Sequence, residues 1–305
     1  MTAKRPDSLE EEGYISLVGH VSAPQNLTVG GLLRFFEHFS QQDREDIRHT
    51  MEVETNAILV ASFGTVSTGL NINLDNIENV FLSHNHKDHT GGLINLKLNH
   101  PTSFSNAHVG EGIFYSRPNS TANEHYILNN KNTLEELGIN FKTHQNPSQI
   151  IPGLWTTGKI PRKYDEKNWS ELGKMVDSNG NKVEDTIPED QSLFFDTDNG
   201  IVLISGCGHA GLVNTLDYVQ KIIPNRPIYK IIGGFHLLNL SENKLEWTAK
   251  MMEESGVKFF VGAHCTGINS TYSIRNFMNL SPKNALVGSV GTYITNQGIF
   301  PGYMQ

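Results

Sequence analysis

Three histidines and one aspartate lie within six residues of a single segment, His84-Asn85-His86-Lys87-Asp88-His89. Imidazole and carboxylate groups are ligands that zinc, iron and manganese accept in proteins. A turn through this segment can direct the first two histidines at one metal ion. It can direct the aspartate and the last histidine at a neighbouring ion. The spacing therefore predicts half of a two-metal site, and distant parts of the chain must supply the remaining ligands.

Three later segments place metal-competent side chains directly after apolar runs. They are Ser205-Gly206-Cys207-Gly208-His209, Gly233-Gly234-Phe235-His236 and Gly262-Ala263-His264-Cys265. Strands of one sheet end at a common edge, so the loops that follow them can converge on one point. We expect His209 and His264 to join the site. For His236, three interpretations stay open: a metal ligand, a substrate contact, or a partner that orients a ligand.

The chain has two cysteines, Cys207 and Cys265, and each lies beside a proposed ligand. Either cysteine is a candidate thiolate ligand, and the alternative for both is a small buried residue packed under the site. Two cysteines exclude a disulfide framework, so a reducing cytoplasm is the predicted location.

Two metal ions held about 3.5–4 Å apart can share a water, lower its pKa and stabilise the attacking and leaving oxygens. The predicted cofactors are therefore two divalent metal ions. Zinc is the first choice, and iron or manganese are the alternatives because imidazole and carboxylate accept all three.

The elements that must position these loops follow from apolar runs and their period. Strands are expected at 14–21, 56–63, 79–83, 191–206 (a pair joined by a turn), 229–234 and 258–264, and helices at 30–39, 210–223 and 241–256. The segment 100–190 is read as loops and short elements over the site. Two blocks of strands flanked by helices predict an α/β fold with two sheets packed face to face and helices outside.

Composition narrows the class of protein further. The chain has 305 residues and a formal net charge of -8, with 24 basic and 32 acidic residues and no basic run. Binding to nucleic acid is therefore not expected. No apolar stretch has the length of a membrane span, and the N-terminus lacks the apolar segment of a secretory signal. We expect a polar tail at 1–13 and a single domain at 14–305. The oligomeric state is not encoded in these patterns.

At the histidine segments the chain resembles the metallo-β-lactamase superfamily, whose His-x-His-x-Asp-His signature after a strand matches residues 84–89. Further stretches resemble one branch, the dihydropterin-linked ribofuranosylaminobenzene-phosphate synthases. They are GKIPR (158–162), PEDQSLFF (188–195), GIVLISGCGHAGLVNTL (200–216), IIGGFHLL (231–238) and AHCTG (263–267). The match extends over residues 55–291.

The resemblance implies an αββα four-layer sandwich, with two mixed β-sheets face to face and the metal site along one edge. It makes His84 and His86 ligands of one metal, and Asp88 and His89 ligands of the other. It matches His264 to the last histidine ligand and leaves His209 as the remaining imidazole.

Two departures from the family pattern stand out. Where relatives carry a bridging aspartate after a strand, this chain reads Ser205-Gly206-Cys207, so the bridge is absent, supplied by Cys207, or replaced through His209. Relatives also carry Asp-Thr-Gly at the end of an early strand. The corresponding segment here, ILVASFGT (58–65), has no aspartate.

The first functional interpretation is a metal-dependent hydrolase whose two metals activate a bridging water against an ester, lactone or phosphoester. Asp88 would hold a metal and orient the nucleophile, and His236 would donate a hydrogen bond or proton to the leaving group. The partner is a small-molecule substrate, and a phosphorylated one fits this chemistry.

Two alternatives remain. One is a transferase that forms a dihydropterin–ribofuranosylaminobenzene phosphate conjugate with loss of pyrophosphate. Lys159 and Arg162 are then candidate substrate-binding residues that hold the anion, or else ordinary charges on a loop. The other is a protein that binds a metal or ligand without catalysis. Whether water or an organic nucleophile enters the product separates the first two.

Overall fold

The strands that precede the histidine-bearing loops belong to two different sheets. The computed structural model describes residues 15–17, 33–34, 58–60, 77–118, 126–170, 172–288, 292–295 and 298–300. The larger sheet runs, in spatial order, β15 (Ala285–Val287), β14 (Phe259–Gly262), β13 (Ile228–Gly233), β12 (Gly200–Ser205), β11 (Ser192–Thr197), β8 (Leu154–Thr156) and β7 (Ser148–Ile151). Neighbouring strands from β12 to β15 are parallel, whereas β7, β8, β11 and β12 pair antiparallel.

The second sheet is parallel throughout its described pairs. It runs β3 (Ile58–Val60), β4 (Asn79–Phe81), β5 (Asn106–Gly110) and β6 (Asn140–His144). An antiparallel group orders as β17 (Gly298–Phe300), β16 (Thr292–Thr295), β1 (Ile15–Leu17) and β2 (Leu33–Arg34). A hairpin pairs β9 (Lys174–Val176) with β10 (Lys182–Glu184).

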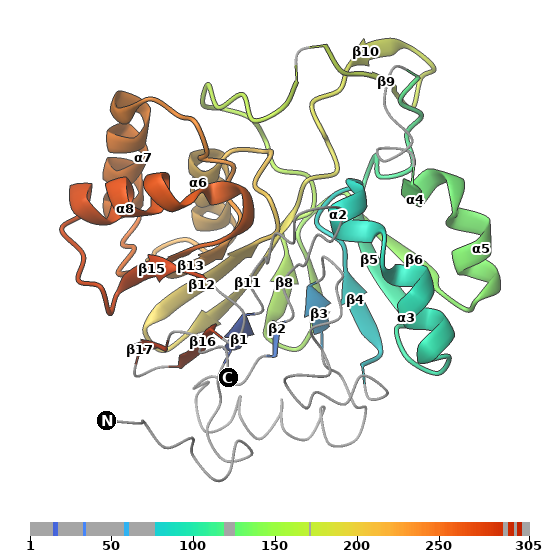
Figure 1. Ribbon diagram of the computed structural model, residues 1–305, viewed down its shortest axis with the longest axis horizontal. Coiled ribbons are helices and arrows are strands. Elements are labelled where there is room, and N and C mark those ends of the chain that lie inside the picture. Colours follow the sequence, from blue (N-terminus) through green and yellow to red (C-terminus); the bar gives the residue numbers. More distant parts are fainter. Residues whose placement is uncertain are drawn as a thin grey trace, which may run out of the picture.

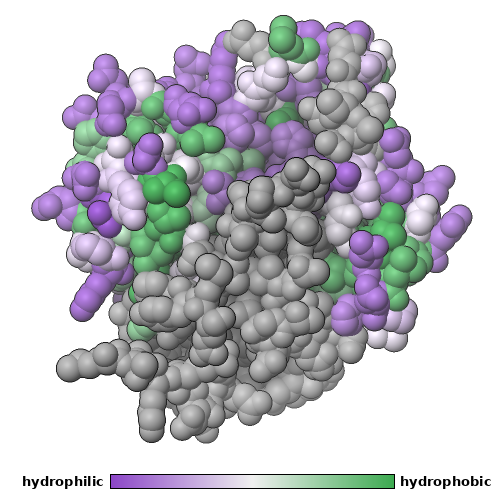
Figure 2. Space-filling view, viewed as in Figure 1, coloured by the Kyte–Doolittle hydropathy of each residue, from purple (hydrophilic) through white to green (hydrophobic). Residues whose placement is uncertain are grey.

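Helices cover the outer face of each sheet (Figure 1). On the larger sheet lie α6 (Leu212–Ile222), α7 (Glu242–Glu254) and α8 (Ile268–Phe277). Beside the second sheet lie α2 (Lys87–Thr90), α3 (Leu93–Asn99), α4 (Tyr126–Asn129) and α5 (Lys131–Glu136), and a short 3₁₀ helix η3 spans His264–Thr266. Hydrophilic residues gather along the left and right margins of the molecule, over these helices (Figure 2). None of the helices in the described ranges is long and apolar enough to cross a membrane.

The alternation of side chains along β12 shows how the layers form. Ile201 and Leu203 pack with residues of α6 and α7, whereas Val202 and Ile204 pack in a core that also holds Phe81 of the second sheet. A third core lies between the second sheet and its helices. Since successive strand side chains point to opposite faces, each apolar strand joins two layers. The result is the predicted αββα sandwich.

Two of the sequence-based expectations about elements were wrong. Residues 33–34 form β2 rather than part of a helix, and the rest of 30–39 lies outside the described residues. The segment 100–190 contributes β5 to β8, which are integral strands of both sheets. Their pattern was hard to detect because β6 and β7 are edge strands with partly exposed side chains that do not alternate cleanly. The proposed tail at 1–13 lies outside the described residues, and the single-domain boundary stays a prediction.

A buried glutamine joins the two sheets next to the histidine loop. The side chain of Gln191 donates to the carbonyl of Leu82 at 3.1 Å and accepts from the Thr156 hydroxyl at 2.7 Å. Its backbone amide donates to the carbonyl of Ser83 at 3.1 Å. All three partners are buried. Because a buried amide must be fully hydrogen-bonded, Gln191 fixes the start of β11 against the end of β4.

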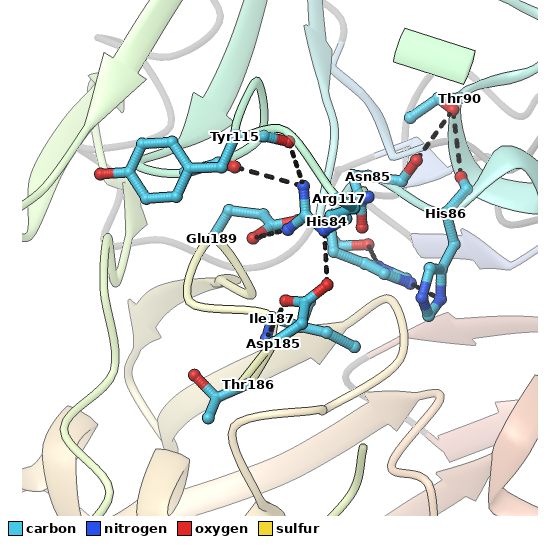
Figure 3. Close-up of polar contacts among 12 residues, drawn as sticks. His84, Asn85, His86, Thr90, Tyr115, Arg117, Asp185, Thr186, Ile187 and Glu189 are labelled. Carbon is cyan, nitrogen blue, oxygen red and sulfur yellow. Dashed lines mark hydrogen bonds and ion pairs between the residues drawn. The ribbon is translucent and has the colours of Figure 1, made fainter. Parts of the chain in front are cut away.

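A buried ion pair holds the loop that leads into β11 (Figure 3). Arg117 is 1% exposed, and its guanidinium lies 2.6 Å from Asp185 and 2.8 Å from Glu189. It also donates to the carbonyl of Tyr115 at 3.1 Å. The segment after β5 is therefore tied to residues 185–189, which run directly into Asp190 and Gln191.

Two histidines outside the predicted metal ligands, His108 and His144, form a row of hydrogen bonds in the parallel sheet. The Nε2 atom of His108 lies 3.0 Å from the Asn79 side-chain oxygen, and its Nδ1 lies 2.9 Å from Nε2 of His144. Nδ1 of His144 lies 2.6 Å from the Ser148 hydroxyl. Since the Asn79 oxygen can only accept, His108 carries its proton on Nε2. Burial, together with His144 and Lys142, lowers the pKa of His108 to about 4.

His108 should therefore make stability depend on pH. Its pKa is near 6.5 in the unfolded chain and lower in the folded protein, so the unfolded chain binds the proton first as pH falls. The contribution to the unfolding free energy is unchanged above pH 6.5 and declines between pH 6.5 and about 4, by roughly 3 kcal/mol. Urea unfolding of the wild type and of His108→Gln at several pH values measures this. A difference between the two proteins that stays constant from pH 7.5 to 4.5 would contradict the prediction.

Candidate metal centre

The topology brings the four histidine-bearing segments to one place. The parallel strands β12, β13 and β14 end side by side and are followed by Cys207 and His209, by His236, and by His264. β4 of the second sheet ends just before Ser83 and His84. Ligands of α/β proteins bind at the carboxyl ends of strands, because the loops there converge. The edges of both sheets meet at this point.

Close backbone contacts at the strand ends explain two of the glycines. A Cβ atom on Gly206 would lie 2.2 Å from the Ser83 hydroxyl, and one on Gly234 would lie 2.3 Å from the carbonyl of Gly206. Both distances are far shorter than any real carbon contact. Glycine at these positions therefore lets the loop after β12 pass between the loop after β4 and the loop after β13.

Three imidazoles form what we call the first histidine group: His84, His86 and His209. Nε2 of His84 lies 2.9 Å from Nδ1 of His86. The ring of His209 lies 4.6 Å from that of His84 and 4.9 Å from that of His86, measured between centroids. Figure 3 shows His84 and His86 pointing toward each other from the loop before α2. These side chains direct ring nitrogens into one small volume.

A second group consists of Asp88, His89 and His264. The Nε2 atoms of the two histidines lie 3.0 Å apart. The Oδ2 atom of Asp88 lies 3.4 Å from Nε2 of His89 and 3.3 Å from Nε2 of His264. We call this the second histidine group. Its members come from α2 and η3, which are 175 residues apart.

Cys207 lies between the two groups. Its Sγ atom and one ring nitrogen each of His84 and His209 all lie within 4.8 Å of one another, and the same holds for Cys207 with His89 and His264. The thiol is buried. A single sulfur atom is thus within ligand distance of both groups.

The protonation of His209 tests whether this place suits a cation. Its Nδ1 lies 2.5 Å from the carbonyl of Asn168, which can only accept, so the proton sits on Nδ1. Its Nε2 atom is then an unprotonated acceptor, and it is buried with no hydrogen-bond partner among the described residues. Buried polar atoms are almost always paired. A metal ion is the partner that such a nitrogen fits.

The electrostatics of the groups agree with that fit. Burial and the neighbouring histidines hold the pKa of His84 and His209 well below the usual value, so both imidazoles are neutral, which is the form that binds metals. Burial alone would raise the pKa of Asp88. The hydrogen bond with His264 and the nearby histidines instead hold that pKa below its usual range. The residues present therefore fit divalent cations, with Asp88 ionised.

The two residues predicted to hold a substrate anion, Lys159 and Arg162, lie in different surroundings. Arg162 had been a candidate for holding a substrate anion, but its guanidinium donates to the carbonyl of His209 at 2.5 Å and to the carbonyls of Thr186 and Ile187. These contacts position the His209 loop, and the anion-binding role stays a prediction. Lys159 is half-exposed, with its Nζ atom 4.0 Å from a carboxylate oxygen of Glu111.

Asp190 was not among the residues predicted for the site. One carboxylate oxygen accepts from the backbone amide of Ala210 at 2.8 Å, and the other is buried without a partner among the described residues. Burial raises the pKa of Asp190 to about 7, against the opposing effect of the Ala210 amide and Arg162. The PEDQ motif that contains it was the one available signal.

His236 lies at the border of the site. Its ring centroid is 4.6 Å from that of His209, and its Nδ1 atom is 3.6 Å from the sulfur of Cys207. The backbone of His236 has φ of 49° and that of His264 has φ of 51°. Such left-handed conformations are uncommon outside glycine and cluster at functional sites.

The chain is similar to known proteins both in sequence and in fold. No protein-family model matches the chain. It is 31% identical over 206 residues to the 7,8-dihydropterin-6-methyl-4-(beta-D-ribofuranosyl)-aminobenzene-5'-phosphate synthase of Methanocaldococcus jannaschii. The aligned region covers 66% of this chain and 70% of that protein. It is 29% identical over 224 residues to the uncharacterized protein MJ0448 of the same organism, covering 70% and 77% of the two chains.

Two solved structures share the fold. Tm1679, described as a metal-dependent hydrolase of the beta-lactamase superfamily, superposes with a TM-score of 0.64 at 20% identity, covering 93% of this chain and 98% of that one. The metallo-beta-lactamase fold protein YhfI from Bacillus subtilis superposes with a TM-score of 0.51 at 12% identity, covering 92% and 98%. At these identities the likeness concerns the fold alone.

Replacing His86 should remove bound metal without unfolding the protein. His86→Ala takes one nitrogen from the first histidine group. We expect metal affinity to fall by at least about 100-fold, because losing a direct ligand lowers the affinity at least as much as losing a residue that orients a ligand. Metal per chain after dialysis, with circular dichroism as the check on folding, gives the measurement. His100→Ala, which changes a histidine outside both groups, is the control. Equal metal content in the two variants would count against the site.

Proposed function

Since the chain belongs to the metallo-β-lactamase superfamily, in the branch that contains the dihydropterin-linked phosphate synthases, we propose that it is a metal-dependent hydrolase that cleaves an ester, lactone or phosphoester with water. The observation that carries the proposal is the arrangement of two histidine groups that share Cys207. Two sets of donors on either side of one sulfur are what a two-cation site requires.

The donors divide between the cations as follows. His84, His86 and His209 would hold one cation, and Asp88, His89 and His264 the other, with the Cys207 thiolate common to both. Zinc suits this set best, because imidazole and thiolate are ligands that it favours, and iron or manganese are the alternatives. When bound, such cations lower the pKa of water and stabilise negative charge on oxygen.

The side chains of the site have separate tasks in this proposal. Asp88, ionised and 28% exposed, holds the nucleophilic water by accepting its proton in a hydrogen bond. His236 directs Nδ1 at Cys207, so Nε2 is the ring atom that would contact the leaving group, and it donates a hydrogen bond or proton there in the form that carries a proton on Nε2. Arg162 and Asn168 keep the ring of His209 in place through backbone carbonyls.

A transferase is the second candidate, and the sequence relative favours it. The Methanocaldococcus jannaschii protein, 31% identical, is named as a synthase. In this reaction a carbon or nitrogen nucleophile would form the new bond while a carbon–oxygen bond to pyrophosphate breaks, and Lys159 would attract the anion. A protein that binds metal or ligand without turnover is the third candidate. The small-molecule substrate and the cytoplasmic location stay predictions.

Product analysis separates these functions. Metal-loaded protein is incubated with a panel of esters, lactones and phosphodiesters in water enriched in oxygen-18, and the label is sought in the acid or phosphate product. In parallel, pyrophosphate release is measured with a dihydropterin methyl pyrophosphate and a ribofuranosylaminobenzene phosphate. A hydrolase incorporates the label, whereas the synthase releases pyrophosphate only when both reactants are present. Full metal occupancy with neither product would overturn both enzyme assignments.

Cys207 supplies a further prediction about the shared ligand. Cys207→Ala should weaken binding of the second cation by at least about tenfold, since each group loses a donor. Cys207→Asp places a carboxylate of similar size at this position, and it should recover binding of two cations. Calorimetric titration with metal compares the two variants with the wild type. If Cys207→Ala binds two cations as tightly as the wild type does, the thiol only packs beneath the site.

A further inference from the structure

The two cysteines and His236 form a third cluster of metal-competent atoms beside the histidine groups. The sulfur atoms of Cys207 and Cys265 lie 3.1 Å apart, although the residues are 58 positions apart in sequence. Nδ1 of His236 lies 3.6 Å from the Cys207 sulfur. The three donor atoms all lie within 4.8 Å of one another. Two of these residues, His236 and Cys265, take no part in either histidine group.

The separations are close to those that one tetrahedral cation imposes. With Zn–S bonds of about 2.3 Å and Zn–N bonds of about 2.05 Å, a sulfur and a nitrogen lie about 3.6 Å apart and two sulfurs about 3.8 Å apart. The Cys207–His236 separation already matches. The two sulfurs need to part by about 0.7 Å, a shift within reach of small side-chain rotations.

Backbone contacts hold the cluster in this form. The amide of His236 donates to the sulfur of Cys265 at 3.2 Å, and that thiol lies 3.2 Å from the carbonyl of Cys207. The amide of Leu238 donates to the carbonyl of Cys265 at 3.2 Å. The left-handed backbone of His236 and of His264 turns both loops toward this point. Donors fixed in advance lose little freedom when an ion binds.

The donor set differs in kind from the two histidine groups. Two sulfurs and one nitrogen are soft ligands, which select thiophilic cations over magnesium, calcium or manganese. The histidine groups, with five imidazoles and a carboxylate between them, are harder and accept a wider range of metals. The sulfur of Cys207 lies at the junction, and a thiolate can bridge neighbouring cations.

We propose that Cys207, His236 and Cys265 form a third binding site, for a thiophilic divalent cation such as zinc or cadmium, which adjoins the histidine groups and shares the sulfur of Cys207 with them. Three protein ligands leave the fourth position of the ion open. The site shares Cys207 and His236 with the residues proposed for catalysis, and it differs from the histidine groups in using the thiol of Cys265.

Cadmium reports directly on thiolate ligation, because thiolates bound to it have a charge-transfer band in the ultraviolet. The full-length protein, kept reduced, is titrated with cadmium and the band is recorded for the wild type, His86→Ala and Cys265→Ser. We expect His86→Ala to keep the full band while binding fewer cations in total. Cys265→Ser should lose about half of the band, since one of two thiolates is gone, and should keep binding to the histidine groups.

Alkylation of the wild type tests the same site without any substitution. Bound cadmium should protect Cys265, the more exposed of the two thiols, from iodoacetamide at least tenfold, and peptide mass spectrometry locates the label. The proposal is overturned if the band disappears in His86→Ala, if Cys265→Ser keeps the whole band, or if cadmium protects Cys207 alone.

Discussion

The confinement of six buried or half-buried imidazoles within one small space is the constraint from which the rest of the site follows. Neighbouring rings of the cluster lie 4.2–4.9 Å apart between centroids. Protonated imidazoles at such distances would repel one another strongly in a medium of low dielectric constant. Burial and mutual repulsion keep His84 and His209 neutral. Asp88 instead holds the pKa of His264 above its usual value. Divalent cations would supply the positive charge that the neutral rings of His84 and His209 lack.

The fold maintains this confinement by joining two sheets at one edge. Gln191 connects the start of β11 to the backbone after β4, and the glycine at 206 lets the loop after β12 approach Ser83. Each contact crosses from the larger sheet to the second. The apolar core between the sheets, which includes Phe81 and Val202, brings the strand ends together. Packing at the centre of the sandwich thus sets the distances between donors at its rim.

The sequence could predict which side chains converge but not the contacts that orient them. His84, His209 and His264 each follow an apolar run, and a strand followed by a histidine is visible in a single sequence. Arg162 and Asn168 act on His209 through backbone carbonyls, and such contacts leave no pattern of residue types. For the same reason Arg162 had suggested an anion site, since its charge is visible in the sequence and its buried partners are not.

Strands were missed where their side chains do not alternate. β12 is buried on both faces and reads as an unbroken apolar run, which made it easy to predict. β6 lies at the edge of its sheet with three of its five residues exposed, so its sequence resembles that of a loop. Its pairing partner, β5, is what determines that it is a strand. Sequence patterns describe burial, and an edge strand is defined by pairing instead.

A thiol at position 207 changes which metals the centre can favour. A carboxylate at this place would give the shared ligand one negative charge on hard oxygen, and an ionised cysteine gives the same charge on soft sulfur. The charge balance with two divalent cations is therefore preserved, while the preference moves away from manganese and toward zinc. Burial raises the pKa of the Cys207 thiol, so a cation must displace its proton on binding. Metal affinity at this centre should consequently rise with pH, more steeply than it would with a carboxylate in the same position.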